Sequence, residues 1–266
     1  MTQKILFQFF VLVALFFGLW FSLSQINYVD RADIEKFTKE NEKKLGELIL
    51  KTIKATQEEL DSANIRAIID SIGVRICKPS GVDYSNIKIH VIKSEEVNAF
   101  ALPDNNMVIY TGLIDYAKSA EEVAGVMAHE IGHMEKKHVM KKLVKEIGFA
   151  MLFTIAGGDA GFEILRETAR VLSSTAFDRS QETEADNYAI EMMASTNIDP
   201  EHLGNFLFRL AKDHDMPEEL VWISTHPESK ERAAEIISKK KEYSFKSTPI
   251  LKASWEEVQK TFEDAD

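Results

Sequence analysis

Residues 121–138, E-E-V-A-G-V-M-A-H-E-I-G-H-M-E-K-K-H, are the most informative stretch of the chain. Apolar residues recur in it at helical spacing, with Val123 and Ile131 on the same predicted face. In a helix, side chains four positions apart lie about one turn apart and point in similar directions. The stretch therefore predicts a helix on which His129 and His133 can both reach one ion.

The acid between the two histidines indicates what chemistry they support. Glu130 follows His129, so its carboxylate can reach a water molecule bound to an ion that both rings hold. H-E-x-x-H on a helix is typical of zinc hydrolases, in which the glutamate is the general base. Gly132 costs a helix about 1 kcal/mol relative to alanine, which predicts that another segment comes close there. The motif predicts one Zn²⁺ per chain, bound by His129 and His133, with Glu130 as the catalytic base.

A catalytic zinc ion has three protein ligands, so one more must come from elsewhere in the chain. Residues 178–190, D-R-S-Q-E-T-E-A-D-N-Y-A-I, predict a helix capped by Asp178 on which Glu182 and Asp186 share a face. On the residues alone this pair is one candidate among several, because acids on a helix are usually solvated. The candidates downstream of the motif are Asp159, Glu163, Glu167, Asp178, Glu182, Glu184, Asp186 and His226.

The order of these motifs resembles the gluzincin metallopeptidase family that includes the CAAX prenyl protease, HtpX and BepA. The resemblance rests on H-E-x-x-H, E-x-x-x-D at 182–186, N-A-F-A-L-P at 98–103 and S-T-H-P at 224–227, with an arginine after the last. It implies that Glu182 is the third zinc ligand and that Asp186 accepts the free N–H of a ligand histidine. The family often has glycine where this chain has Asp104, which predicts an altered turn.

The resemblance also implies roles for residues away from the zinc ligands. His226 would be catalytic, either stabilising the oxyanion or occupying the open metal position at rest, although a histidine before a proline also fits a helix start. Arg232 would contact the substrate backbone or nearby acids, and an ordinary surface arginine is the alternative. The substrate-binding edge strand would comprise Asn98, Ala99, Phe100 and Ala101, with ordinary sheet core as the alternative.

The predicted fold class is α+β: a mainly helical zincin-like metalloprotease domain with a small β-sheet and hairpin before the zinc-binding helix. Alternating apolar residues predict a strand at 87–92, and a turn at 103–106 joins two further strands into a hairpin. Helices are predicted at 30–60, 61–76, 120–145, 161–174, 180–195, 200–213, 227–241 and 253–263.

The N-terminal residues predict three consecutive regions. Residues 1–26 are a membrane anchor or a signal peptide cut after Ser24, and the long apolar run favours the anchor. Residues 27–62 form a solvated amphipathic helical linker, and residues 63–266 form the metallopeptidase domain. Lys4 precedes the apolar run, which predicts that the catalytic domain lies outside the cytoplasm; export as a soluble protein after cleavage is the alternative.

Composition limits the partners. The net charge of −11 argues against binding to nucleic acid, and the single cysteine, Cys77, excludes an internal disulfide. The predicted partners are polypeptide substrates, and the membrane through the N-terminal segment; the sequence predicts no oligomeric state. By resemblance the function is protein quality control at the cell envelope, with a latent or non-proteolytic zinc-containing chaperone or adaptor as the alternative. His138 is predicted to be exposed, across the helix from the metal.

Overall fold

The computed structural model describes residues 31–213, 221–244, 246 and 248–264. The chain divides into two units, Met1–Asn41 and Glu42–Asp266. No helix among the described residues is both long enough and apolar enough to cross a membrane. The predicted anchor or signal peptide at residues 1–26 lies outside the described residues.

The sheet has the order β1-β3-β2, with β1 (Lys88–Ile92) parallel to β3 (Asn106–Tyr110). β2 (Ala99–Leu102) pairs antiparallel with β3, which confirms the predicted hairpin. Asp104 and Asn105 at its turn have φ of 63° and 54°. Tight hairpin turns require positive φ, and aspartate and asparagine tolerate it better than most residues other than glycine. The chain thus keeps a tight turn although it has Asp104 where the family often has glycine.

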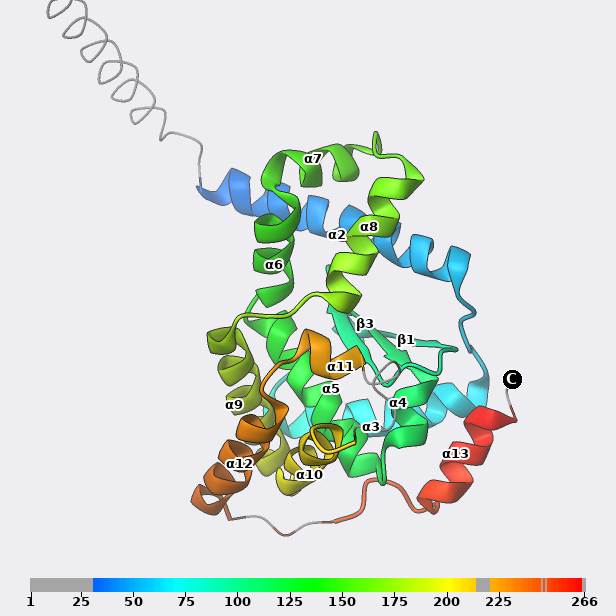
Figure 1. Cartoon of the computed structure of the whole chain (residues 1–266), viewed down its shortest axis with the longest axis vertical. Helices are drawn as coiled ribbons and strands as arrows, with labels where there is room; N and C mark the ends of the chain where they lie inside the picture. The colour runs from blue at the N-terminus through cyan, green and yellow to red at the C-terminus, as the bar shows by residue number, and fades with distance from the viewer. Residues whose placement is uncertain (1–30, 214–220, 245, 247, 265–266) are drawn as a thin grey trace, which may run out of the picture. The chain divides into compact units, whose positions relative to one another are not determined.

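Helix α5 (Ala120–Glu135) is buried along almost its whole length and organises the second unit (Figure 1). It contacts α3 (Ala63–Ser80), α9 (Arg179–Ser195), α10 (Glu201–Leu210) and β2. A Cβ added at Gly132 would lie 3.1 Å from both the Cα and the carbonyl oxygen of Ala185 on α9. The close approach expected at this glycine is therefore confirmed.

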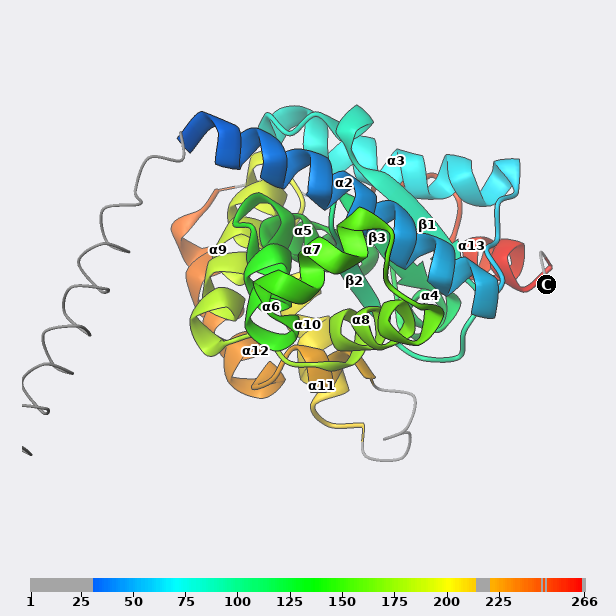
Figure 2. The same ribbon diagram turned by 90° about the horizontal axis from the view of Figure 1, so that it is seen from above.

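The predicted continuous helix over 120–145 is wrong. The structure has α5, then a turn, then α6 (His138–Ile147). Lys137 adopts the left-handed conformation with φ of 57°, which cannot continue a right-handed helix. α7 (Phe149–Gly157) then links α6 to α8 (Phe162–Ser174), as Figure 2 shows.

The remaining elements complete the α+β arrangement that the sequence predicted. α4 (Thr111–Tyr116) and α11 (Val221–Thr225) are short helices, and α12 (Ser229–Lys239) packs on α9 and α10. α13 (Trp255–Glu263) contacts α3 and α4. The described part of the chain also contains two single 3₁₀ turns, η1 at Tyr84–Asn86 and η2 at Lys240–Glu242.

Helix α2 (Arg31–Thr56) is more than a linker. From Glu42 onward it belongs to the second unit, where Leu45, Ile49 and Ile53 are buried in the hydrophobic core. These residues are spaced four apart and so form one apolar face, which a solvated helix would not bury. The compact unit therefore begins at Glu42, 21 residues before the predicted domain start at residue 63.

Candidate metal centre

Four side chains from three separate segments converge inside the second unit. His129 and His133 come from α5, Glu182 from α9, and His226 from the residue after α11. One ligand atom from each lies within 4.8 Å of the others. The Nε2 atoms of His129 and His133 are 3.0 Å apart, and Nδ1 of His226 is 3.2 Å from Nε2 of His129. All four side chains are buried.

Aromatic rings hold two of these histidines in place. Phe177 stacks on His133 with ring centroids 3.9 Å apart and planes 25° apart. Trp222 stacks on His226 at 4.2 Å and 23°. The backbone N–H of Phe177 also donates to the carbonyl oxygen of Thr225. Neither aromatic residue was predicted from the sequence, because their contacts join segments far apart in the chain.

The outer face of His129 is held by an ion-pair network. Its Nδ1 lies 3.0 Å from Oδ1 of Asp186. Arg232 donates to both oxygens of Asp186 at 2.7 Å and also pairs with Glu182. Arg232 is only 5% exposed, so the surface-arginine alternative is wrong and its contact with nearby acids is confirmed.

This network sets the charge of the two acids. Burial by itself would raise the pKa of Glu182, but His226 and Arg232 lower it well below its usual value. Burial would likewise raise the pKa of Asp186, and the guanidinium of Arg232 instead holds it well below its usual range. Both carboxylates therefore stay ionised inside the protein, where they can accept hydrogen bonds or bind a cation.

The donor set fits a metal ion. When His129 donates its Nδ1 proton to Asp186, its Nε2 carries a lone pair directed at Nε2 of His133 and at the carboxylate of Glu182. The carboxylate of Glu182 lies 3.3 Å from Nε2 of His133. Lone pairs that face one another in a buried site repel unless a cation lies among them. Two imidazoles and a carboxylate are also a ligand set that zinc takes in hydrolases.

Glu130 lies beside this cluster and is fully buried. Its Oε2 accepts a hydrogen bond from the backbone N–H of Ala101 at 3.0 Å, and its Oε1 is 3.3 Å from Nε2 of His226. Burial and the charge of Glu182 raise the pKa of Glu130 to about 8. A carboxyl group with a pKa near neutrality is suited to accept and return a proton.

Three of the four residues of the predicted substrate-binding strand, Ala99, Phe100 and Ala101, lie on β2 at an edge of the sheet, and Asn98 directly precedes β2, but that edge is covered. Asn98, Ala99, Phe100 and Ala101 are all buried. The amide of Asn98 donates to the carbonyl oxygen of Ser173 on α8, and the backbone N–H of Trp222 on α11 donates to that of Val97. The structure is therefore closed over the strand that the sequence assigned to substrate.

The prediction that His138 is exposed is wrong. Its ring is fully buried, with Nδ1 3.0 Å from Nδ1 of His133 and Nε2 3.3 Å from a carboxylate oxygen of Glu184. The prediction failed because it assumed one continuous helix, whereas the turn after Glu135 reverses the direction in which His138 points. No local sequence pattern predicts that turn.

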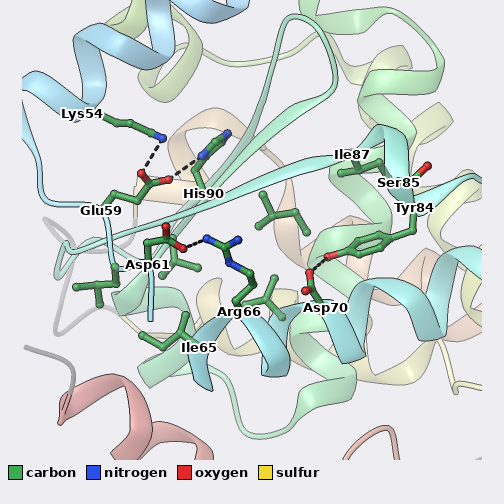
Figure 3. Close-up of a pocket in the computed structure, with 14 residues that line it drawn as sticks. Lys54, Glu59, Asp61, Ile65, Arg66, Asp70, Tyr84, Ser85, Ile87 and His90 are labelled. Atoms are coloured by element: carbon green, nitrogen blue, oxygen red, sulfur yellow. Dashed lines mark hydrogen bonds and ion pairs between the residues drawn. The ribbon is translucent and has the colours of Figure 1, made fainter. Parts of the chain in front are cut away.

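A cavity of about 450 Å³ lies elsewhere, between α3, the end of α2 and the β1 region (Figure 3). Its basic side chains are paired with acids: Arg66 with Asp61, and Lys54 with Glu59, which also contacts His90. Asp70 accepts a hydrogen bond from the hydroxyl of Tyr84. Because these polar groups already have protein partners, the cavity gives no argument for a ligand.

The H-E-x-x-H helix, the acid from a second helix and the adjoining edge strand together define a metallopeptidase of the zincin type. The sequence model of peptidase family M48 matches residues 63–240, and the chain belongs to this family.

Curated relatives agree with that membership. The chain is 25% identical over 213 residues to the beta-barrel assembly-enhancing protease of Escherichia coli, covering 73% of this chain and 42% of the relative. It is 31% identical over 147 residues to the mitochondrial metalloendopeptidase OMA1 of Arabidopsis thaliana, covering 55% and 30%. For the metalloprotease LoiP of Escherichia coli the identity is 31% over 157 residues, covering 57% and 61%. The chain thus spans less than half the length of the first two relatives.

Proposed function

We propose that the protein is a zinc-dependent endopeptidase in which His129, His133 and Glu182 bind the metal. The observation that supports this most directly is the convergence of the two Nε2 atoms and the Glu182 carboxylate in a buried site. Asp186 orients His129, and Arg232 keeps both acids ionised and in position. A zinc ion held by these residues would supply Lewis-acid polarisation of the scissile carbonyl and would lower the pKa of water.

Glu130 is the proposed general base. It takes a proton from the attacking water and later delivers it to the leaving amine. Its contact with the N–H of Ala101 places it at the edge of β2, where an extended peptide would add as a further strand. In this role the strand at residues 98–101 binds the substrate backbone through those backbone groups that do not pair with β3, and the side chains are held by the core.

His226 supports a second candidate function, a latent or non-proteolytic zinc protein. Its Nδ1 belongs to the metal cluster, so it can serve as a fourth protein ligand. A catalytic zinc keeps one position open, whereas four protein ligands close the site. We infer that the closed arrangement is a resting state, and that α11 with His226 must move away from β2 before a peptide can bind. His226 would then be free to donate to the oxyanion.

The test is zinc content together with cleavage of unfolded casein by the full chain and by Glu130→Gln. One zinc per chain with cleavage by the native chain alone supports the peptidase. Zinc without cleavage in either protein supports the latent function, and cleavage gained by His226→Ala would then show that His226 closes the metal site and is not needed at the oxyanion. Absence of zinc from the native chain refutes both.

The proposed setting is quality control of proteins at the cell envelope, with residues 1–26 as a membrane anchor and the catalytic domain outside the cytoplasm. Support comes from the apolar run at residues 5–21 and from similarity to a beta-barrel assembly-enhancing protease. The test is cell fractionation: the chain should remain with membranes after carbonate washing and be digested by protease added to spheroplasts. Full-length protein in the cytosolic fraction would contradict it.

A further inference from the structure

The two histidines of the H-E-x-x-H motif have outer nitrogens with different partners. Nδ1 of His129 meets a carboxylate, that of Asp186, at 3.0 Å. Nδ1 of His133 also has a partner at 3.0 Å, but that partner is Nδ1 of His138. Beyond it, Nε2 of His138 lies 3.3 Å from Oε2 of Glu184. The family resemblance assigns no role to His138 or Glu184.

Only one placement of the ring protons is compatible with these contacts if His133 binds a metal. A neutral histidine that binds metal through Nε2 carries its proton on Nδ1 and needs an acceptor there. Nδ1 of His138 must therefore be the unprotonated nitrogen, which puts the proton of His138 on Nε2. That proton points at the carboxylate of Glu184, which can only accept.

The stacking of His133 on Phe177 explains why an edge contact matters. The stacked ring restrains the plane of the imidazole, at 25° to the phenyl plane. Stacking alone does not distinguish the two ring orientations related by a half-turn about the Cβ–Cγ bond, because both lie in the same plane. That half-turn exchanges Nδ1 with Cδ2 and Nε2 with Cε1, so a hydrogen bond at Nδ1 selects the orientation in which Nε2 faces the metal site.

The backbone supports a specific placement of His138. Lys137 has a positive φ of 57° between two helices, a conformation that side-chain-bearing residues rarely adopt. Such conformations persist where the surrounding structure requires them, often at functional sites. In an uninterrupted helix, a residue five positions after His133 would lie more than a third of a turn round the axis and point away. The Lys137 turn instead brings the ring of His138, which is fully buried, against His133.

We propose that His138, held by Glu184, is a positioning residue that orients His133 for metal binding. The inference rests on the proposed function, since it takes His133 as a metal ligand. It predicts that loss of the acceptor at His138 weakens zinc binding by about 10–100-fold, the usual effect of removing an outer partner of a ligand histidine.

The experiment measures zinc affinity by chelator competition, and the visible spectrum of the Co²⁺ form, for the full chain and its variants. His138→Phe removes the acceptor and should weaken zinc by about 10–100-fold and change the Co²⁺ spectrum. His138→Asn places an amide oxygen where Nδ1 was and should stay close to the native affinity. His138→Gln carries the same amide one bond further out and should behave like His138→Phe. His202→Phe, on α10, is the matched control and should leave zinc affinity unchanged.

These variants separate positioning from a general loss of stability. If His138→Phe does not fold, the comparison of asparagine with glutamine still tests the proposal, because the two side chains differ only in where they place the acceptor. Equal zinc affinities and Co²⁺ spectra for the native chain, His138→Asn and His138→Gln would overturn the proposal. If the native chain binds no zinc, the proposed metal centre is wrong. His138 would then have no ligand histidine to orient, and the proposal for it would be refuted as well.

Discussion

Replacing Arg232 by methionine should cost the metal-free protein much more stability than a typical ion-pair mutation. The side chain of Arg232 is 6% exposed and that of Asp186 is 8% exposed, and the guanidinium forms two hydrogen bonds of 2.7 Å to this carboxylate. The same guanidinium pairs with Glu182. Removing one partner of a buried pair leaves an uncompensated charge, which costs about 3–5 kcal/mol.

The assay is urea unfolding of the metal-free full chain at neutral pH, with two comparisons built from the same chain. Arg179→Met breaks an exposed pair with Glu228, whose side chains are 73% and 39% exposed, and should cost less than about 1 kcal/mol. The double variant Arg232→Met with Asp186→Asn removes both charges. Its loss of free energy of unfolding should be about 1–3 kcal/mol smaller than the sum of the losses in the two single variants.

Two results would refute this reasoning. If Arg232→Met lowers the free energy of unfolding no more than Arg179→Met does, the buried Arg232 pair contributes no more to stability than an exposed pair. If the double variant loses as much stability as the two single variants together, Arg232 and Asp186 are not energetically coupled. The ion pair beside His129 then does not contribute to stability.

Three further predictions follow from individual contacts. Gly132→Ala should lower the free energy of unfolding by about 1 kcal/mol or more, because the added Cβ would press on the backbone of α9. Gly157→Ala is the control and should be neutral or stabilising, because an added Cβ there would meet only an aspartate oxygen at 3.5 Å. Equal effects of the two variants in chemical denaturation would contradict this. In the metal-free protein Glu130 should contribute stability that is lost as pH rises from about 4.5 to about 8, because the folded side chain keeps a proton that the unfolded chain has lost. Buried His133 and His226, whose pKa values are lowered, act in the opposite direction, so the contribution is measured as the difference in free energy of unfolding between the native chain and Glu130→Gln. A difference that does not change with pH would show that the pKa of Glu130 is not raised. Cys77 is fully buried, and burial raises the pKa of its thiol to about 12. Iodoacetamide should therefore label Cys77 only after the protein unfolds. Rapid labelling of the folded chain would contradict its burial.

Several structural features could be predicted because they depend on local spacing. Residues four apart in a helix share a direction, which is sufficient to pair His129 with His133, and Glu182 with Asp186. The turn residues after Leu102 predicted the hairpin, which the structure confirms, and the cost of Gly132 in a helix correctly predicted a close helix crossing. Spacing alone did not choose the third ligand, because nothing local distinguishes one acid on a helix from another; only the family resemblance assigned Glu182.

The sequence by itself determined the α+β class, the H-E-x-x-H helix and the family, since each depends on residues near one another or on motif order. Only the tertiary structure decided that Arg232 is buried against Glu182, that His226 lies among the candidate metal ligands, and that the ring of His138 contacts His133. Those contacts depend on one left-handed residue and on how separate helices pack. Packing arises from many weak interactions between segments far apart in the chain, and no short pattern of residues encodes it.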